Sequence, residues 1–198
     1  MIHMNLKGAV IENKRYLGIA TFMMVFAIAV GASMPIQESP LSENPFLKEL
    51  EPYLQYYKPY TPFTVIFLFL KNSLTAALAF LLGPLLLLFP AGVLLLNGFM
   101  VGFVGSAVAN QVSIQTAFSS LVPHGIFELP ALIFASAAGF RFGVAALRKA
   151  SALLRRRDYS LYFELNSAFR LFIIAVTLLL IAAVIETYVT PFIMGIMP

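Results

Sequence analysis

The sequence contains no cysteine and few charged residues. Without cysteine, the chain has no disulfide, no thiolate nucleophile and no thiolate metal site, and it gives no redox indication of compartment. Charged residues make up 11% of the 198 positions, whereas 60% are hydrophobic. One soluble core of this length could not bury that much apolar surface. The composition therefore predicts an integral membrane protein whose solvent is lipid.

Common hydrolase signatures are also missing. The sequence has no HExxH and no GxSxG pattern, which would supply zinc ligands or a nucleophilic serine. The net charge is +4, but the basic residues cluster beside apolar runs, which is typical of membrane orientation and not of a nucleic-acid surface. We therefore expect neither an enzyme nor a nucleic-acid-binding protein, and no resident cofactor.

Apolar runs long enough to cross the hydrocarbon as helices recur along the chain. They predict an all-α, polytopic membrane helix bundle of about five transmembrane helices, forming a single integral membrane domain over residues 1–198. A short outer helix is expected at 111–120, before the fourth span. A cleavable signal peptide is the alternative for the first run, but secretory apolar cores have about 7–15 residues, and this run is longer. The predicted spans are about 16–34, 63–83, 91–110, 126–147 and 169–189.

The charges of the connecting segments predict the orientation. The segment 148–168 carries five basic residues, and the segment before the first span carries Lys7, Lys14 and Arg15. The loop 35–62 instead holds four glutamates and two lysines, and a short amphipathic helix is expected in it near Pro45 to Tyr57. By the positive-inside rule, the N-terminus and 148–168 are cytoplasmic, and the loop and the C-terminus are extracytoplasmic, in the plasma membrane.

Small residues recur at every fourth position of two predicted spans. Such stripes let helix backbones approach closely in lipid, where no hydrophobic drive brings helices together. We expect both stripes to be helix–helix contacts, either within one chain or across a homodimer. They consist of Gly98, Gly102, Ser106 and Asn110 in the third span, and Ala131, Ala135, Gly139 and Gly143 in the fourth.

The segment LVPHGIFELPA (121–131) places polar residues inside this apolar chain. His124 and Glu128 are one helical turn apart, and Glu128 continues into the small-residue stripe, which directs the pair toward the helix interface. Pro123 is suited to a first helical turn beside Gly125, and Pro130 predicts a kink next to Glu128. Glu128 would lie about 7 Å inside the outer end of the span.

The predicted topology brings further polar residues to the same outer half of the bilayer. Charged side chains there need partners or water, and Lys71 is the candidate cation for Glu128 or Glu186. Asn97 is expected to stand apart, nearer the cytoplasmic side. The predicted pocket residues are Lys71, Asn72, His124, Glu128 and Glu186.

Three interpretations of this outward-open polar pocket remain open. The side chains can serve structure alone, through buried hydrogen bonds and an ion pair. They can form a site that transports or binds an ion, a proton or a lipid headgroup. The third interpretation is an intramembrane enzyme, with His124 as a base or with His124, Glu128 and Glu186 as metal ligands; two ligands on one helix indicate a metal only weakly.

The segment LVPHGIFELPALIFASAAGFRFG, together with FLKNSLTA, LLLNGFMVG and AAVIETYVTP, resembles the stage II sporulation protein M family. The likeness extends from about Phe69 to Pro191. It implies five spans with the N-terminus inside, and a membrane scaffold like the namesake of endospore-forming bacteria, which recruits two extracytoplasmic peptidoglycan hydrolases. Family members also occur in organisms that form no spores, including archaea. The resemblance marks as characteristic the positions Asn72, Asn97, Pro123, His124, Gly125, Glu128 and Glu186.

We therefore expect a non-enzymatic scaffold or assembly partner with an outward-facing polar pocket. The alternatives are a transporter or channel-like protein acting through His124, Glu128 and Glu186 and, less favoured, an intramembrane metal-dependent hydrolase. The expected partners are the lipid bilayer and extracytoplasmic proteins, with a homodimer left open.

Overall fold

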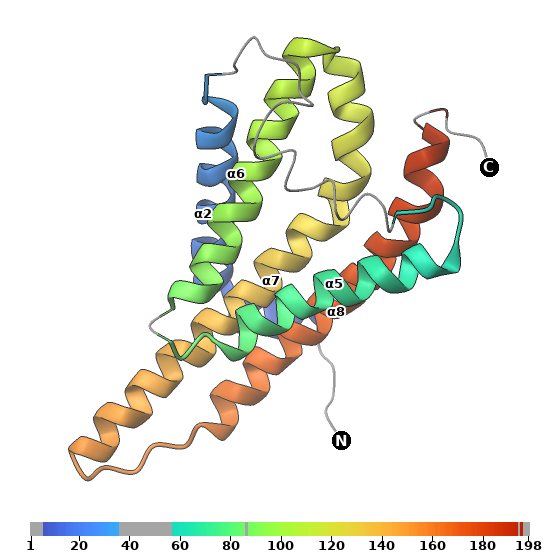
Figure 1. Cartoon of the computed structure of the whole chain (residues 1–198). Helices are drawn as coiled ribbons and strands as arrows, with labels where there is room; N and C mark the ends of the chain where they lie inside the picture. Colours follow the sequence, from blue (N-terminus) through green and yellow to red (C-terminus); the bar gives the residue numbers. More distant parts are fainter. Residues whose placement is uncertain (1–5, 36–56, 86, 194, 196–198) are drawn as a thin grey trace.

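All regular structure in the described part of the chain is helical. The computed structural model describes residues 6–35, 57–85, 87–193 and 195, and of residues 6, 120 and 122–124 only the backbone. No strand occurs in these ranges, which confirms the all-α prediction. Figure 1 shows the helices α1 (Leu6–Glu12), α2 (Lys14–Ala32), α5 (Pro62–Leu81), α6 (Leu88–Gln111), α7 (Ile114–Leu154) and α8 (Tyr162–Ile193).

Among the described residues, five helices are long and apolar enough to cross a membrane. They are α2, α5, α6, the Gly125–Leu154 part of α7, and α8, and they confirm the expected polytopic bundle. In lipid a helix satisfies its own backbone hydrogen bonds, so apolar length alone largely determines which segments become helices. Most of the loop 35–62, including residues 45–56 of its expected amphipathic helix, lies outside the described residues.

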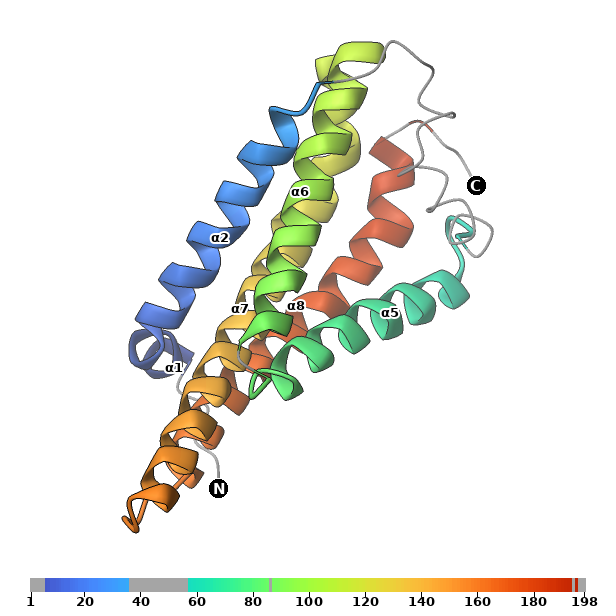
Figure 2. The same cartoon turned by 60° about the vertical axis from the view of Figure 1, so that its left-hand side comes forward.

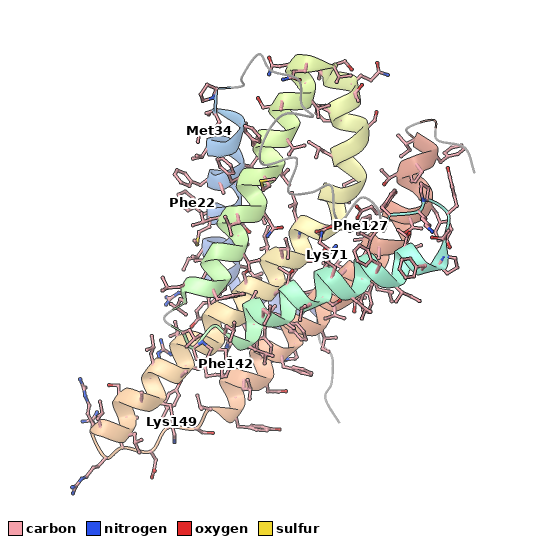
Figure 3. All side chains as sticks on the ribbon, viewed as in Figure 1. Phe22, Met34, Lys71, Phe127, Phe142 and Lys149 are labelled. Carbon is pink, nitrogen blue, oxygen red and sulfur yellow. The ribbon has the colours of Figure 1, made fainter. Side chains whose placement is uncertain are left out.

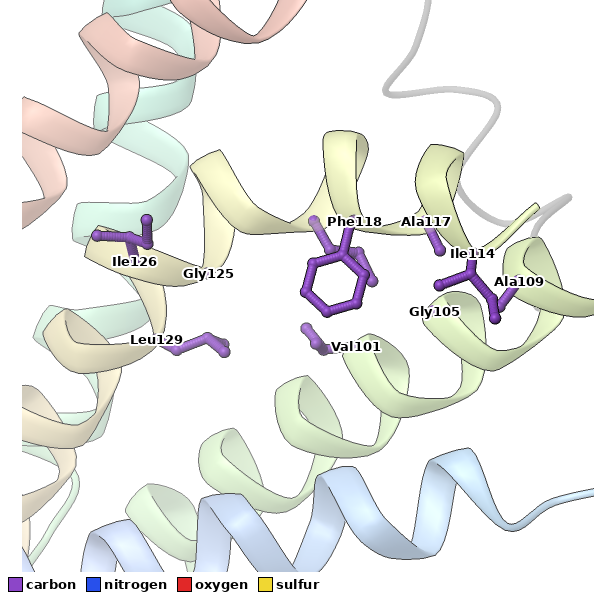
Figure 4. A pocket seen from close by; sticks show the side chains of 10 residues that line it. Val101, Gly105, Ala109, Ile114, Ala117, Phe118, Gly125, Ile126 and Leu129 are labelled. Atoms are coloured by element: carbon purple, nitrogen blue, oxygen red, sulfur yellow. The ribbon is translucent and has the colours of Figure 1, made fainter. Parts of the chain in front are cut away.

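The expected outer helix is the first part of α7. Ser113 caps this helix, because its side-chain oxygen accepts a hydrogen bond from the Thr116 N–H at 3.0 Å. The ribbon then bends beside Gly125 without leaving the helical state (Figure 4). Pro123 and Pro130 lie within the helix on either side of this bend. A proline removes one backbone donor from the helix, which accounts for the change of direction.

Helix α7 is the centre of the bundle. It contacts α2, α5, α6 and α8, and 61% of its most apolar window is buried, against 22–33% for the other four spans. Figures 1 and 2 show α7 and α8 as a long antiparallel hairpin, with α2 and α6 side by side as a second pair and α5 running along α8. Most residues in the central part of α7 are therefore surrounded by protein, and buried polar ones among them need protein partners.

The small-residue stripe of α6 packs against α2 within one chain. A Cβ atom added at Gly98 would lie 2.8 Å from the Met24 carbonyl oxygen, and one at Gly102 would overlap the Ile28 carbonyl oxygen. Such overlap means that the two backbones touch, which only glycine permits. This part of the stripe therefore contacts α2 of the same chain and not a second copy.

The stripe of α7 packs against α5 in the same way. A Cβ at Gly139 would overlap the Ala79 carbonyl oxygen, and one at Gly143 would overlap that of Gly83, just after α5. Ala135 and Ala131, one and two turns before Gly139 on α7, are fully buried. The predicted small-residue contacts on α7 are therefore confirmed as contacts within the bundle.

Candidate functional site

Three of the predicted pocket residues lie on the three helices α5, α7 and α8, which pack against one another. Asn72 on α5 and Glu128 on α7 are buried, with 7% and 6% of their surface exposed, and Glu186 on α8 is half-buried. Lys71 is exposed on α5 (Figure 3). A buried amide, a buried carboxylate and a half-buried carboxylate in one helix triplet need polar partners or water, so this region is the candidate site.

For two further predicted residues, the structure describes only the backbone. His124 and Pro123 lie in the helical part of α7 beside the bend, but their side chains are outside the described residues. Among the described residues, no three His, Cys, Asp or Glu side chains gather as a metal would require. A metal site that includes His124 is thus neither supported nor tested.

A closely packed apolar layer lies beside the polar residues, on the side toward the α7–α8 connection. Ala76 follows Asn72 by one turn on α5, and Ala131 and Ala135 follow Glu128 on α7. These alanines form one buried cluster with Ala175 and Leu179 of α8, and all five side chains are fully buried. The layer therefore lies between the polar side chains and the end of the bundle at the α7–α8 connection.

The segment 57–61, just before α5, is attached to the C-terminal part of α8. The Tyr57 hydroxyl donates to the Glu186 carbonyl oxygen at 2.9 Å, and the Tyr60 N–H donates to the Thr187 carbonyl oxygen at 3.1 Å. The rings of Tyr60 and Tyr188 lie 6.5 Å apart. This segment therefore lies next to Glu186 on α8.

Burial, together with the smaller effects of the nearby Glu186 and Tyr60, raises the pKa of the Tyr57 hydroxyl from its ordinary value of 10 to about 12. The phenol is therefore neutral and a hydrogen-bond donor at any physiological pH. It is fixed as the donor that holds the segment to α8.

Asn97 lies away from these residues, on α6. Its side-chain amide donates to the Val93 carbonyl oxygen at 2.7 Å, one turn earlier. It lines a cavity of about 540 Å³ between α5 and α6, whose other lining residues are Thr75, Leu85, Leu88, Phe89, Gly92, Val93 and Leu96. This lining contains none of the pocket residues above.

A second cavity, of about 420 Å³, lies beside Gly125 between α6 and the first part of α7 (Figure 4). Its described lining is entirely apolar in side-chain type and includes Val101, Phe118 and Leu129. The cavity next to the bend therefore suits hydrocarbon, and it is separate from the face of α7 that carries Glu128.

The structure also contains a polar network at the opposite end, which the sequence interpretation missed. Arg141 of α7 is buried and donates to Glu164 Oε2 at 2.7 Å, to Asn13 Oδ1 at 2.8 Å and to Ser167 Oγ at 2.7 Å. The Asn13 amide donates to Ser167 Oγ at 3.1 Å. The network thus joins the start of α2, the middle of α7 and the start of α8.

Helix α1 is connected to the same network. Ser167 donates to Glu12 Oε2 at 2.8 Å, and Arg170 of α8 forms an ion pair with that oxygen at 2.6 Å. The Arg141 guanidinium also lies 5.6 Å from the Phe163 ring. Arg141 stands at the end of a stretch, 125–140, whose only charged residue is Glu128. Its position within an otherwise apolar run was the signal that it needs partners inside the protein.

Comparisons with known proteins agree with these features. The pattern of the family described as Stage II sporulation protein M matches residues 18–191. An uncharacterized protein of Methanocaldococcus jannaschii, MJ0793, is 32% identical over 129 residues. That alignment covers 64% of this chain and 65% of the relative's length. No solved structure matches the chain.

Proposed function

Because the chain belongs to the stage II sporulation protein M family, we propose that it is a non-enzymatic membrane scaffold. In this proposal it assembles with an extracytoplasmic protein at the outer ends of α5, α7 and α8. The site is built from Asn72, Glu128 and Glu186, with His124 and Lys71 as further candidates. A sporulation-protein-M-type membrane protein follows from the family alone, whereas the role in assembly is the proposal.

The observation that carries the proposal is the position of Asn72 and Glu128 beside a fully buried apolar layer. Both side chains are buried, and the residues that follow them inward, Ala76, Ala131 and Ala135, are fully buried as well. In the proposed orientation this buried layer lies between the two polar residues and the cytoplasmic half of the bundle. This arrangement favours recognition at the outer surface over passage through the membrane.

The same layer is the reason for placing the transport alternative second. A pathway for an ion would connect the Glu128 region with the polar residue Asn97 nearer the inner side. The described cavity at Asn97 has no lining residue on α7 or α8, and its lining does not include Glu128. A carrier would have to separate the closely packed alanines of α5 and α7 during each cycle, at a cost in packing energy.

The orientation proposed is cytoplasmic for the N-terminus and extracytoplasmic for the segment 57–61, in the plasma membrane. This orientation is supported by the position of the start of α2, where Asn13 is hydrogen-bonded to Arg141 and Ser167. The start of α2 lies toward the same end of the bundle as the basic α7–α8 connection (Figure 1). The positive-inside rule assigns that side to the cytoplasm.

The proposal is tested by photo-crosslinking from Lys58, which is exposed on the segment that would meet a partner. A photoreactive residue at this position is introduced into the full chain in its native cells, alone and with Glu128→Gln or Asn72→Ala. We expect the parent to crosslink an extracytoplasmic protein. In both variants the yield of this crosslinked product should fall at least about ten-fold, because the loss of one buried polar contact of about 1.4 kcal/mol weakens binding by that factor.

Asn110→Ala is the matched control, because Asn110 is also an asparagine of an apolar helix but is exposed. It should leave the yield unchanged. If the crosslink persists in Glu128→Gln and Asn72→Ala, and both variants also complement a deletion, the site has no role in assembly. Flux of protons or ions into vesicles containing the purified protein, abolished by Glu128→Gln, would establish the transport alternative instead.

A further inference from the structure

An aromatic cleft opens where α5 ends and α8 begins, at the end of the bundle opposite the candidate site. It has a volume of about 500 Å³. The rings of Phe80 and Phe142 lie 5.7 Å apart at its base, and Tyr162 at its rim is 80% exposed. Its lining residues are Phe80, Leu81, Phe142, Tyr162, Leu165, Asn166 and Phe169.

The cleft lies at the inner edge of the hydrocarbon. Leu81 is the last residue of α5, and Phe142 follows Arg141, which is hydrogen-bonded to Asn13 at the start of α2. The end of α5 and the start of α2 thus lie at the same level of the bundle as the cleft. A lipid acyl chain could enter such a cleft sideways from the adjoining leaflet, with Asn166 as the amide near its ester groups.

Basic side chains continue from the cleft toward the tip of the α7–α8 hairpin. Lys149 follows Phe142 by seven residues and so lies on the same face of α7, about 10 Å further along (Figure 3). Its amine donates to the Tyr159 carbonyl oxygen at 2.8 Å, which ties the tip loop to α7. The segment 148–158 has five basic residues and one acid, Asp158.

Apolar side chains are exposed at the same tip. Leu153 and Leu154, next to Arg155, are 73% and 86% exposed, although α7 reaches about 20 Å beyond Arg141 at this point. The positive-inside rule explains the basic residues, but it requires neither exposed leucines nor an aromatic cleft. Basic and apolar residues together are typical of segments that lie in the headgroup region.

We propose that this end of the protein binds an anionic phospholipid. One acyl chain occupies the cleft beside Phe142 and Tyr162, and the negatively charged headgroup meets Lys149 and the arginines of the tip. Leu153 and Leu154 insert beside it into the interfacial region. The site would anchor the inclined hairpin to the inner leaflet, independently of any partner at the outer end.

The chain contains no tryptophan, so one introduced tryptophan reports on one place. The full chain carrying Tyr162→Trp is reconstituted in two kinds of phosphatidylcholine vesicle. One contains brominated phosphatidylglycerol, which is anionic, and the other contains brominated phosphatidylcholine, which has no net charge. Bromine quenches tryptophan fluorescence on contact, so the quenching reports which lipid lies beside the tryptophan at this position. We expect the anionic lipid to bind beside this tryptophan about five-fold more strongly or better. Adding Lys149→Gln should reduce that preference about five-fold, the effect of one basic residue at a charged surface.

Two controls distinguish a site from general attraction. Arg15→Gln removes an exposed charge at the start of α2 and should leave the preference unchanged, and a tryptophan at Ile19, exposed on α2, should show no preference. Leu165→Trp is the second reporter if Tyr162→Trp does not fold.

Equal quenching by both lipids, an unchanged preference in Lys149→Gln, or the same preference at Ile19→Trp would each overturn the proposal. Binding of a soluble polyanion through Lys149 without a lipid preference would also overturn it, in favour of an acidic macromolecule.

Discussion

Removing the Arg141 side chain is the most direct test of the inner polar network. Arg141→Met keeps the helix and most of the side-chain volume but removes hydrogen bonds to Glu164, Asn13 and Ser167. Breaking a buried ion pair costs about 3–5 kcal/mol, because the remaining charge is left desolvated. The Glu164 side chain is 22% exposed and can regain some water, which places the loss at the lower end, about 3 kcal/mol.

For a chain of this size, a loss of about 3 kcal/mol corresponds to a melting temperature lower by about 6–12 °C. The measurement is thermal unfolding of the purified full chain in detergent, followed by circular dichroism and by the fraction that stays monodisperse on size exclusion. Arg148→Met is the control, because Arg148 is exposed on the same helix. It should change the stability by about 0.5 kcal/mol or less.

A double variant tests whether the loss arises from the pair itself. Arg141→Met combined with Glu164→Leu leaves no unpaired carboxylate beside α7, so it should be more stable than Arg141→Met alone. Additivity of the two changes within about 0.5 kcal/mol would refute the reasoning. A melting temperature of Arg141→Met equal to that of the parent would refute it as well.

Three further changes test other contacts by the same unfolding measurement. Gly102→Ala should cost about 1–3 kcal/mol, because the added methyl overlaps the backbone of α2, whereas Gly92→Ala, with nothing within 4 Å of the added atom, should cost nothing. Ser136→Ala should be neutral or stabilising, since the buried Ser136 Oγ has no hydrogen-bond partner among the described residues. Burial raises the folded-state pKa of Tyr57 above its ordinary value of 10 to about 12, so stability should fall as the pH rises from 10 to 12. Tyr57→Phe should cost about 1 kcal/mol at pH 8 and reduce that fall; an unchanged alkaline profile would contradict the role of this hydroxyl.

The helices of this protein could be predicted from the sequence because lipid imposes a simple rule. A backbone in hydrocarbon must satisfy its own hydrogen bonds, so a long apolar run has almost no alternative to a helix. The stripes containing Gly98 and Gly139 could be identified for the same reason, since close packing in lipid selects small residues. Their partners, α2 and α5, could not be identified, because a glycine specifies a close approach and not which helix approaches.

The candidate site was predictable by residue type and only partly by geometry. Depth along a span places Glu128 near the outer side, and the structure buries it as its stripe predicts. Two adjacent residues on α5 then differ, since Lys71 is exposed and Asn72 is buried. That difference depends on how α5 is rotated against α7 and α8, which hydropathy does not determine.

By itself, the sequence determined the membrane class and the number of spanning helices, because these depend on local composition and on the rise of a helix. Only the tertiary structure decided which distant residues meet. Asn13, Arg141 and Ser167 are separated by 128 and 26 positions and lie on three helices, yet they share hydrogen bonds. Such contacts depend on the rotation and crossing of whole helices, which is set by the packing of every neighbour at once.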